Sequence, residues 1–422
     1  MNKDPDEGKS PQELRREREQ RLMDCIHLKP TDRVPVGCEL GFFVGRYTGV
    51  PSSAAYYDCD AWFAACRQAL EEFRPDMASV RGFTSGKALE YLDPKVWLWP
   101  GHGTDAETGE FQTHETESLQ DDEYDFFMKE PADFMLRRHL PRLYGSLQAL
   151  SKLPPLSDTL WIEPWAGEIL AMSVTEPEVE EAIQNLLHAG HEMRKCLPRM
   201  HEFQQLLLEY GVPSGAQGGV LPPFDMVSHA VRGMKGTMLD MFRRPDKLLE
   251  LCEFLLQKAL ARPTPPPNEY GHTRMFMTNT RGSDNFLSNE QFEKFYWPHA
   301  KKLMLTLIER GMTPCMFLEG NFDKKLEYLL ELPKGSTLIR LDRTDIFRAK
   351  EILGGHLCIE GNVPVSLLQA GTVQEVRDYC KKLIDVVGAG GGYILSPRST
   401  TTHVKPENLK AMIDFTKEYG RY

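Results

Sequence analysis

The feature that most constrains this chain is an alternation of short apolar runs with longer segments of helical periodicity. The runs are rich in apolar and β-branched residues, as in VPVGCEL at 34–40 and STLIRLD at 336–342. The segment 372–388 is typical of the helices between them, with a capping-box pair of Thr372 and Glu375 and a closing Gly388. Eight strands alternating with helices predict an α/β protein with a parallel (β/α)8 barrel of the TIM type. The predicted strands are 34–40, 76–81, 215–220, 274–279, 314–319, 336–342, 356–361 and 392–397.

The domain organisation follows from the segments that a minimal barrel does not need. Residues 1–28 are charged and carry an amphipathic pattern, which predicts an N-terminal helical arm that ends before Pro30 and Pro35. Residues 29–422 predict a single barrel domain, with an insertion and a long helix at 82–210 between the second and third strands. An open doubly wound sheet is the alternative, but the segment ELGFFVG lacks the glycine fingerprint expected after its first strand.

Composition limits the partners and the compartment. The chain of 422 residues is 41% hydrophobic and 26% charged, as expected for a packed globular protein. Its 61 Asp and Glu outnumber its 50 Lys and Arg, and the net charge of -11 argues against nucleic acid or an anionic membrane as the main partner. No stretch approaches the roughly 18 apolar residues of a membrane span, and the start lacks an apolar signal segment. The nine cysteines form no CxxC pair, which is typical of reduced thiols. We therefore expect a cytoplasmic protein that binds a small molecule.

Candidate site residues follow from the barrel, because the strand ends and the loops after them face the active site. Glu319 is the first catalytic candidate, since it ends the run CMFLE and precedes Gly320 and Asn321. Asp342 ends the next strand, and His403 lies in the loop after the last one. The two carboxylates could divide acid and base roles, hold a divalent metal through Glu319, or pair with nearby arginines in a structural network. The substrate-binding candidates are Glu39, Arg81, Asn279, Asp284, Arg340, Glu360 and Arg398.

Several motifs of other enzyme classes are missing from the sequence. There is no HExxH or other cluster of histidines and cysteines at metal-ligand spacing. There is also no GxSxG nucleophile elbow, Walker loop or corrinoid-binding DxHxxG segment. If a corrinoid takes part in the reaction, it must therefore arrive on another protein.

The second half of the chain closely resembles the uroporphyrinogen decarboxylase superfamily. The resemblance rests on CIEGNVPVSLLQAGTVQEVRDYCKKLIDVVGAGGGYILSP and KPENLKAMIDFTKEYG, and on the shorter segments DRVPV, RRPDKLLE and FLSNEQFEKFYWP. It covers roughly residues 29–422 and is least clear over 82–210. It implies either a tetrapyrrole decarboxylase or an enzyme that moves methyl groups between a substrate, a corrinoid protein and a thiol or pterin.

Departures from the family pattern narrow the expected reaction. The decarboxylases carry an aspartate after the second strand, where this chain has Arg81. The zinc-dependent thiol methyltransferases carry an H-x-C pair and a later Cys, where this chain has Phe317 and Glu319, then Arg398 or Ser399. A thiol-activating zinc site needs soft ligands, so the usual zinc ligands are missing and a divalent metal is not supported by them.

The resemblance thus implies the methyltransferase component of a corrinoid-dependent demethylase. Such an enzyme would move a methyl group from an ether or amine to cobalamin on a partner corrinoid protein, with a carboxylic acid or a metal assisting the leaving group. The alternatives are a decarboxylase or lyase that grips a non-porphyrin acid with Arg81, Arg340 or Arg398, and a barrel that binds without catalysis. A homodimer is compatible with each of these hypotheses.

Overall fold

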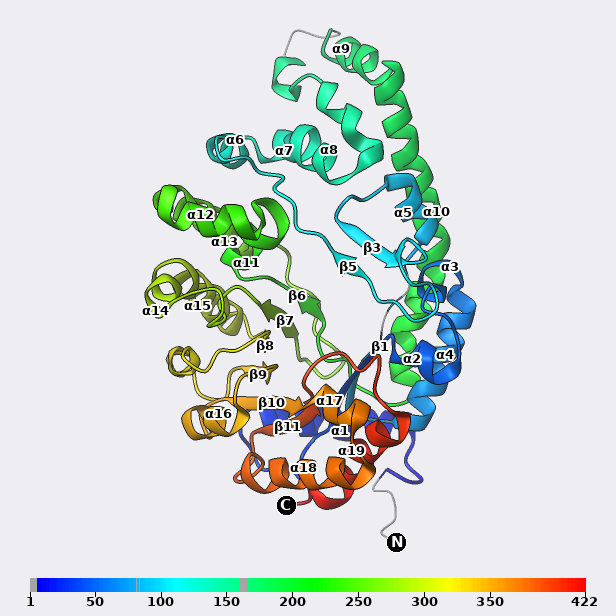
Figure 1. Cartoon of the computed structure of the whole chain (residues 1–422), viewed down its shortest axis with the longest axis vertical. Coiled ribbons are helices and arrows are strands. Elements are labelled where there is room, and N and C mark those ends of the chain that lie inside the picture. The colour runs from blue at the N-terminus through cyan, green and yellow to red at the C-terminus, as the bar shows by residue number, and fades with distance from the viewer. Residues whose placement is uncertain (1–5, 81, 83, 160–164) are drawn as a thin grey trace.

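A ring of parallel strands forms the centre of the molecule. The computed structural model describes residues 6–80, 82, 84–159 and 165–422. Six strands pair in the order β11-β10-β9-β8-β7-β6, and β1 pairs with β2. Two further contacts join these sheets: Leu395 N donates to Pro35 O at 2.9 Å, and Ala78 N donates to Pro213 O at 3.3 Å. The strands are β1 (Gly37–Gly41), β2 (Met77–Val80), β6 (Gly218–Gly219), β7 (Arg274–Asn279), β8 (Thr313–Leu318), β9 (Leu338–Leu341), β10 (Cys358–Val363) and β11 (Tyr393–Pro397) (Figure 1).

The predicted α/β fold with a parallel sheet is confirmed, and each predicted run overlaps one of these strands. The third is the shortest, because the segment 215–220 is rich in glycine and a glycine offers no side chain to pack on the sheet.

Helices connect the strands and cover the outside of the ring. They are α2 (Phe43–Thr48), α3 (Ala54–Tyr57), α4 (Cys59–Phe73), α11 (Pro223–Met226), α12 (Gly233–Arg243), α13 (Pro245–Leu260), α14 (Asn289–Gln291), α15 (Trp297–Glu309), α16 (Ile346–Leu353), α17 (Val365–Ala370), α18 (Val373–Val386) and α19 (Pro406–Tyr419), with the single turns η4 (Val227–Val231), η5 (Phe292–Tyr296) and η6 (Leu326–Glu331).

Helix α1 (Pro11–Ile26) closes the floor of the barrel. Ser10 and Glu13 form a capping box at its start, which satisfies backbone N–H groups that a helix end leaves free. Its buried side chains Leu22 and Ile26 belong to an apolar cluster with residues from the first half of five strands. Those partners are Met77 of β2, Cys315 of β8, Leu338 of β9, Cys358 of β10 and Ile394 of β11.

A buried ion network fixes this floor. Asp76, just before β2, is fully buried and accepts hydrogen bonds from Arg33 Nη2 at 2.6 Å and Arg21 Nη1 at 3.0 Å. Burial alone would raise the pKa of Asp76, but the two guanidinium groups hold it well below its usual range. Because a buried carboxylate without partners would be costly, this network requires α1 to stay docked.

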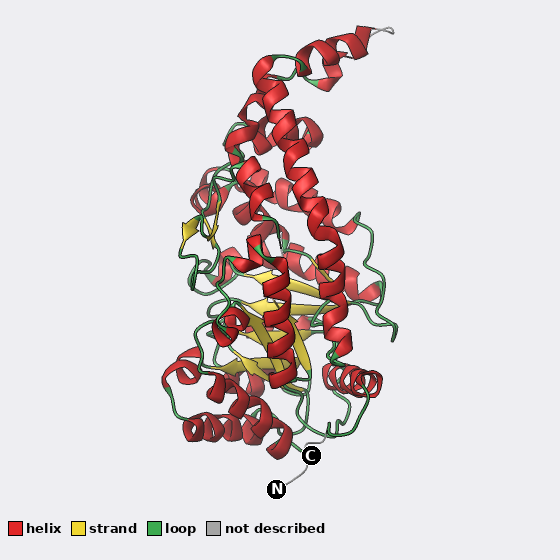
Figure 2. Ribbon diagram, turned by 90° about the vertical axis from the view of Figure 1, so that its right-hand side faces the viewer, coloured by secondary structure: helices red, strands yellow, loops and turns green. Residues whose placement is uncertain are grey.

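The segment between β2 and β6 rises above the ring of strands. It contains the long helix α10 (Pro177–Glu209), whose 33 residues span about 50 Å at 1.5 Å per residue. Figures 1 and 2 show α10 running from beside the barrel to the top of the molecule. The other elements of the segment are α5 (Gly86–Leu92), β3 (Trp97–Pro100), β4 (Gly103–Thr104), β5 (Gln112–Thr113), α6 (Tyr124–Lys129), α7 (Pro131–Phe134), η1 (Met135–His139), α8 (Leu140–Leu143), η2 (Gly145–Lys152), η3 (Leu156–Thr159) and α9 (Trp165–Val174).

Besides the cluster at the floor, the described residues form one large core and one smaller core. The large core joins the barrel strands to the helices around them and extends into α6 and α7. The smaller core lies in the upper segment, where Leu147, Leu150 and Leu153 pack against Val179 and Ala182 of α10. Among the described residues, no helix is both long enough and apolar enough to cross a membrane.

Candidate active site

A cavity of about 310 Å³ lies inside the barrel. Its floor contains Met77, Cys315 and Leu338, which also belong to the cluster packed on α1. Phe276 lies at the level of Cys315, with which it pairs in register, and the polar side chains of the lining include Glu39, Arg340, Glu360 and Ser396. The floor is therefore apolar, and the charges form a ring nearer the mouth.

Three of the predicted substrate-binding residues meet in that ring. Arg340 and Glu360 face each other because they pair in register on β9 and β10, and alternate residues of a strand point to the same side. Arg340 Nη1 donates to Glu39 Oε2 at 3.0 Å, and Arg340 Nε lies 3.7 Å from Glu360 Oε1. The guanidinium also lies over the Phe317 ring, 4.9 Å from its centroid. One cation thus sits between two carboxyl groups.

Glu360 is the most deeply buried carboxyl group of the cavity, with 4% of its surface exposed. Burial raises the pKa of Glu360, although Arg340 and a hydrogen bond with Ser396 oppose the rise and Glu39 adds to it. A carboxyl group with a raised pKa can hold a proton and deliver it to a bound molecule. Glu360 therefore has the environment of a general acid.

Two buried polar atoms near the ring have no hydrogen-bond partner within the described part of the chain: Arg340 Nε and Asn362 Oδ1. Asn362 follows Glu360 by two residues on β10, but it is not among the residues that line the cavity. Its amide Nδ2 donates to Thr344 O at 3.1 Å, so the side chain is held against the segment that follows β9. The strand-end rule did not select Asn362.

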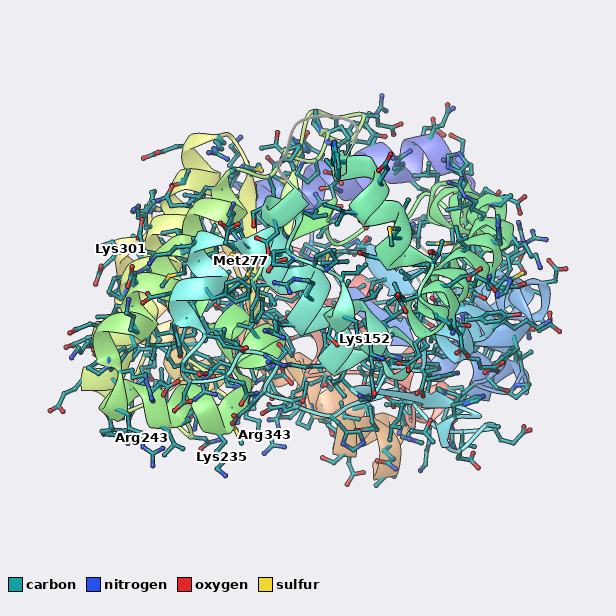
Figure 3. All side chains as sticks on the ribbon, turned by 90° about the horizontal axis from the view of Figure 1, so that it is seen from above. Lys152, Lys235, Arg243, Met277, Lys301 and Arg343 are labelled. Atoms are coloured by element: carbon teal, nitrogen blue, oxygen red, sulfur yellow. The ribbon has the colours of Figure 1, made fainter. Side chains whose placement is uncertain are left out.

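Glu319 and Asp342, the predicted catalytic pair, lie after neighbouring strands but not among the residues that line the cavity. Glu319 is exposed and accepts a hydrogen bond from Thr280 Oγ1 at 3.0 Å. Asp342 is half-buried and accepts one from Gly320 N at 2.9 Å. Arg343 Nε lies 4.0 Å from Asp342 Oδ2, and the Arg343 side chain is mostly exposed. In the view from above, Arg343 lies at the edge of the molecule and Lys152 of η2 lies near the middle (Figure 3).

The remaining predicted residues lie in separate places. His403 is exposed, and its Nδ1 lies 2.9 Å from Arg46 Nη1. Asn279 is buried, and its Nδ2 donates to Met277 O at 3.0 Å. Asp284 accepts from Lys324 N at 3.0 Å and faces Lys325 at 3.6 Å. Arg398 is half-buried, and Arg81 lies outside the described residues.

A second buried carboxyl group, Asp225, supports the loop after β7. It accepts hydrogen bonds from the backbone N–H groups of Arg281 at 2.8 Å and Thr280 at 3.3 Å, and from Tyr296 Oη at 2.5 Å. Burial raises the pKa of Asp225 to about 6 against these hydrogen bonds and against His229, 3.7 Å away. Asp225 lies in a helix that follows β6, where the strand pattern gave no signal for it. Through Thr280 it positions Glu319.

The described residues do not fit the zinc that the resemblance implied. They contain no group of three His, Cys, Asp or Glu side chains that could hold a metal ion. Cys38 and Cys315 of the cavity are deeply buried, and burial raises the pKa of each thiol to about 12. Neither belongs to a group of three such side chains in the part of the chain that the structure describes.

Comparisons with known proteins agree with this architecture. A solved methyltransferase from Methanosarcina mazei shares the fold with a TM-score of 0.58 and 16% identity, covering 95% of this chain and 98% of that one. The methylcobamide:CoM methyltransferase MtbA of Methanosarcina acetivorans is 26% identical over 216 residues, which are 50% of this chain and 60% of that protein. The match thus spans less than two thirds of the relative. The model of the uroporphyrinogen decarboxylase (URO-D) family matches residues 174–419, more than half of the chain. The chain therefore belongs to the uroporphyrinogen decarboxylase family.

Proposed function

We propose that this protein is the methyltransferase component of a corrinoid-dependent demethylase. It would take a methyl group from an ether- or amine-type small molecule and pass it to cobalamin carried by a partner protein. The observation that carries the proposal is the buried Glu360 beside Arg340, inside a cavity of about 310 Å³. The likeness to a methylcobamide:CoM methyltransferase supports the choice of methyl transfer within the family.

The size of the cavity supports a small molecule as its ligand. Drug-sized ligands occupy pockets of roughly 300 Å³ or more, whereas a corrinoid is far larger than such a ligand. The sequence contains no DxHxxG segment, so the cobalamin would arrive on its carrier and approach from the open end of the barrel.

We assign the acid role to Glu360. When the methyl carbon leaves an ether oxygen, the electron pair of the broken bond stays on that oxygen. The oxygen then needs a proton, and a buried carboxylic acid can supply it. Arg340 and Glu39 would orient the substrate.

We propose Glu319, Asp342 and His403 as further catalytic residues, and the other predicted binding residues as further substrate contacts. The exposure of Glu319 is compatible with contact to both the substrate and the partner. We also propose that residues 1–28 are an N-terminal helical arm and that 29–422 are a single barrel domain with an insertion and a long helix at 82–210. A homodimer is a further prediction, which light scattering after size exclusion tests.

A decarboxylase is favoured by one observation. Arg398 Nε is buried and has no hydrogen-bond partner among the described residues, so this arginine could grip a carboxylate. Arg340 suits that role less well because it already faces two carboxyl groups.

Reconstitution separates the hypotheses. The chain is mixed with a reduced corrinoid carrier protein and a panel of methyl ethers and methylamines, and methylation of the corrinoid is followed by absorbance. Transfer that requires both proteins is expected. Release of carbon dioxide from a small acid, without methyl transfer from any donor, would support the decarboxylase. Binding of a donor without any turnover would support a non-catalytic barrel.

A further inference from the structure

A second cavity, of about 510 Å³, adjoins the first and has no role in the chemistry described above. Phe276 of β7 lines both cavities. The side cavity is bounded by the upper segment through Phe127 and Met135, and by the segment after β6 through Leu221 and Met226. Figure 1 shows α6 and α7 on the same side of the barrel as α11, α12 and α13.

Glycine accounts for the empty space. Strand β6 consists of Gly218 and Gly219, so no side chain from this strand fills the cavity. A Cβ atom at Gly219 would meet only Phe276 O, at 3.6 Å. As a result Phe276 keeps 37% of its surface exposed although it lies in the barrel wall. Buried aromatic rings in well-packed cores are normally covered on both faces.

The lining of the side cavity is apolar, with few polar groups. His139 lines it, but its Nδ1 is paired with Ser118 Oγ at 2.8 Å, and burial lowers the pKa of His139 to about 4. The imidazole is therefore neutral at pH 7. The charged side chain of the lining is Arg262, which is exposed at the rim. Such a lining suits a neutral apolar group and offers no carboxylate to a cation.

Aromatic geometry adds a preference for rings. Phe276 and Phe317 are stacked, with centroids 6.5 Å apart and an interplanar angle of 21°. Phe317 in turn carries Arg340 on its ring. A planar substrate can lie against the exposed surface of Phe276 in the side cavity while its polar end reaches Arg340 and Glu360. An apolar cavity of about 150 Å³ already holds benzene, so the side cavity has room for a bicyclic ring.

We propose that the side cavity binds the aromatic part of the substrate, so that the methyl donor is an aryl methyl ether and not a methylamine. This inference rests on the proposed methyl-transfer function. In the reaction, the bond between the methyl carbon and the aryl oxygen breaks and a bond forms from that carbon to the reduced cobalt of the partner's corrinoid. The electron pair stays on the oxygen, which takes the proton of Glu360 and leaves as a phenol.

Direct binding tests the site without turnover. The ligands are 2-methoxynaphthalene, dimethyl ether as the small ether, and trimethylamine, measured by calorimetry on the purified chain. Ala230 lines only the side cavity, so Ala230→Phe fills it. Ala370→Phe adds the same side chain at an exposed end of α17, away from both cavities. Thr278→Leu is a second filling variant from β7, with melting temperatures checked for all three.

The expected result is that wild type and Ala370→Phe bind 2-methoxynaphthalene, while both filling variants bind it at least tenfold more weakly. Tight binding of trimethylamine in place of the aryl ether, or unchanged aryl ether binding in both filling variants, would overturn the proposal. If aryl ether binding depends on the side cavity but no donor is demethylated with a corrinoid partner, the site stands and the proposed function fails.

Discussion

At the scale of single residues, Glu360 is a candidate acid because its side chain is buried beside Arg340. The strand-end rule selected Glu39, Arg340 and Glu360, because such a rule follows from the parallel order of strands. It could not predict that they would meet, since that depends on register between β9 and β10 and on the closing of the ring at β1. The strand-end rule also gave Glu319 as the first catalytic candidate, because the position of a residue at the end of a strand does not show whether its side chain is buried.

The first prediction compares the two carboxyl groups. Glu360→Gln keeps the shape but removes the transferable proton, so methyl transfer should fall by about 10² to 10⁴. Transfer by the wild type should also decline as pH rises through the raised pKa of Glu360, because the acid must be protonated to act. Single-turnover rates from pH 5 to 9 measure both effects.

Glu319→Gln is the matched variant, and it carries the prediction made from the sequence. A comparable loss of rate without a change in melting temperature would make Glu319 essential as well. If Glu319→Gln is inactive and Glu360→Gln transfers methyl groups normally, the acid is Glu319 and not Glu360.

A second prediction concerns the stability of the Asp225 site. The folded pKa of Asp225, about 6, lies above its ordinary value of 3.8, so between these pH values the folded state binds more protons than the unfolded state. Stability from this group is therefore lost as pH rises from about 4 to about 6, by up to about 3 kcal/mol. Urea unfolding of wild type and Asp225→Asn at pH 4 and pH 7 checks this. The variant should lose less stability over that interval, and parallel profiles would contradict the assignment.

At the scale of elements, alternation in the sequence predicted the strands well because each is short, apolar and followed by a helix. The sequence did not predict where α1 would dock. Its amphipathic pattern indicated a helix with one apolar face, but the partner of that face is assembled from five strands distant in the chain. For the upper segment the sequence predicts an insertion and a long helix but not how they pack, because the small core there forms between residues far apart in sequence.

The third prediction tests whether α1 is part of the barrel. Leu22 is fully buried at the floor, so Leu22→Ala should lower the free energy of unfolding by about 2 to 5 kcal/mol. Gln20→Ala, on the exposed side of the same helix, should change it by less than about 0.5 kcal/mol. Chemical denaturation of both variants gives the comparison, and equal small effects would mean that the helix is only loosely attached.

At the scale of the whole molecule, family membership leaves the reaction open, and two measurements on the intact protein narrow it. The fourth prediction is that the purified chain shows no corrinoid absorbance, because it has no corrinoid-binding segment. A visible corrinoid in stoichiometric amount would place the cofactor on this chain.

The fifth prediction concerns the reaction for which the family is named. The position where the tetrapyrrole decarboxylases keep an aspartate holds Arg81. Incubation with uroporphyrinogen should therefore give no coproporphyrinogen by chromatography. Turnover of that substrate would contradict the assignment to methyl transfer.

The length of α10 has a consequence for how the protein melts. This one helix contacts α1 and α4 beside the barrel and α5 and η2 in the upper segment. Because α10 packs against both parts, unfolding of either part removes contacts that stabilise the other. The two cores are therefore expected to give a single calorimetric peak, with equal calorimetric and van't Hoff enthalpies, where separately folded lobes would give two.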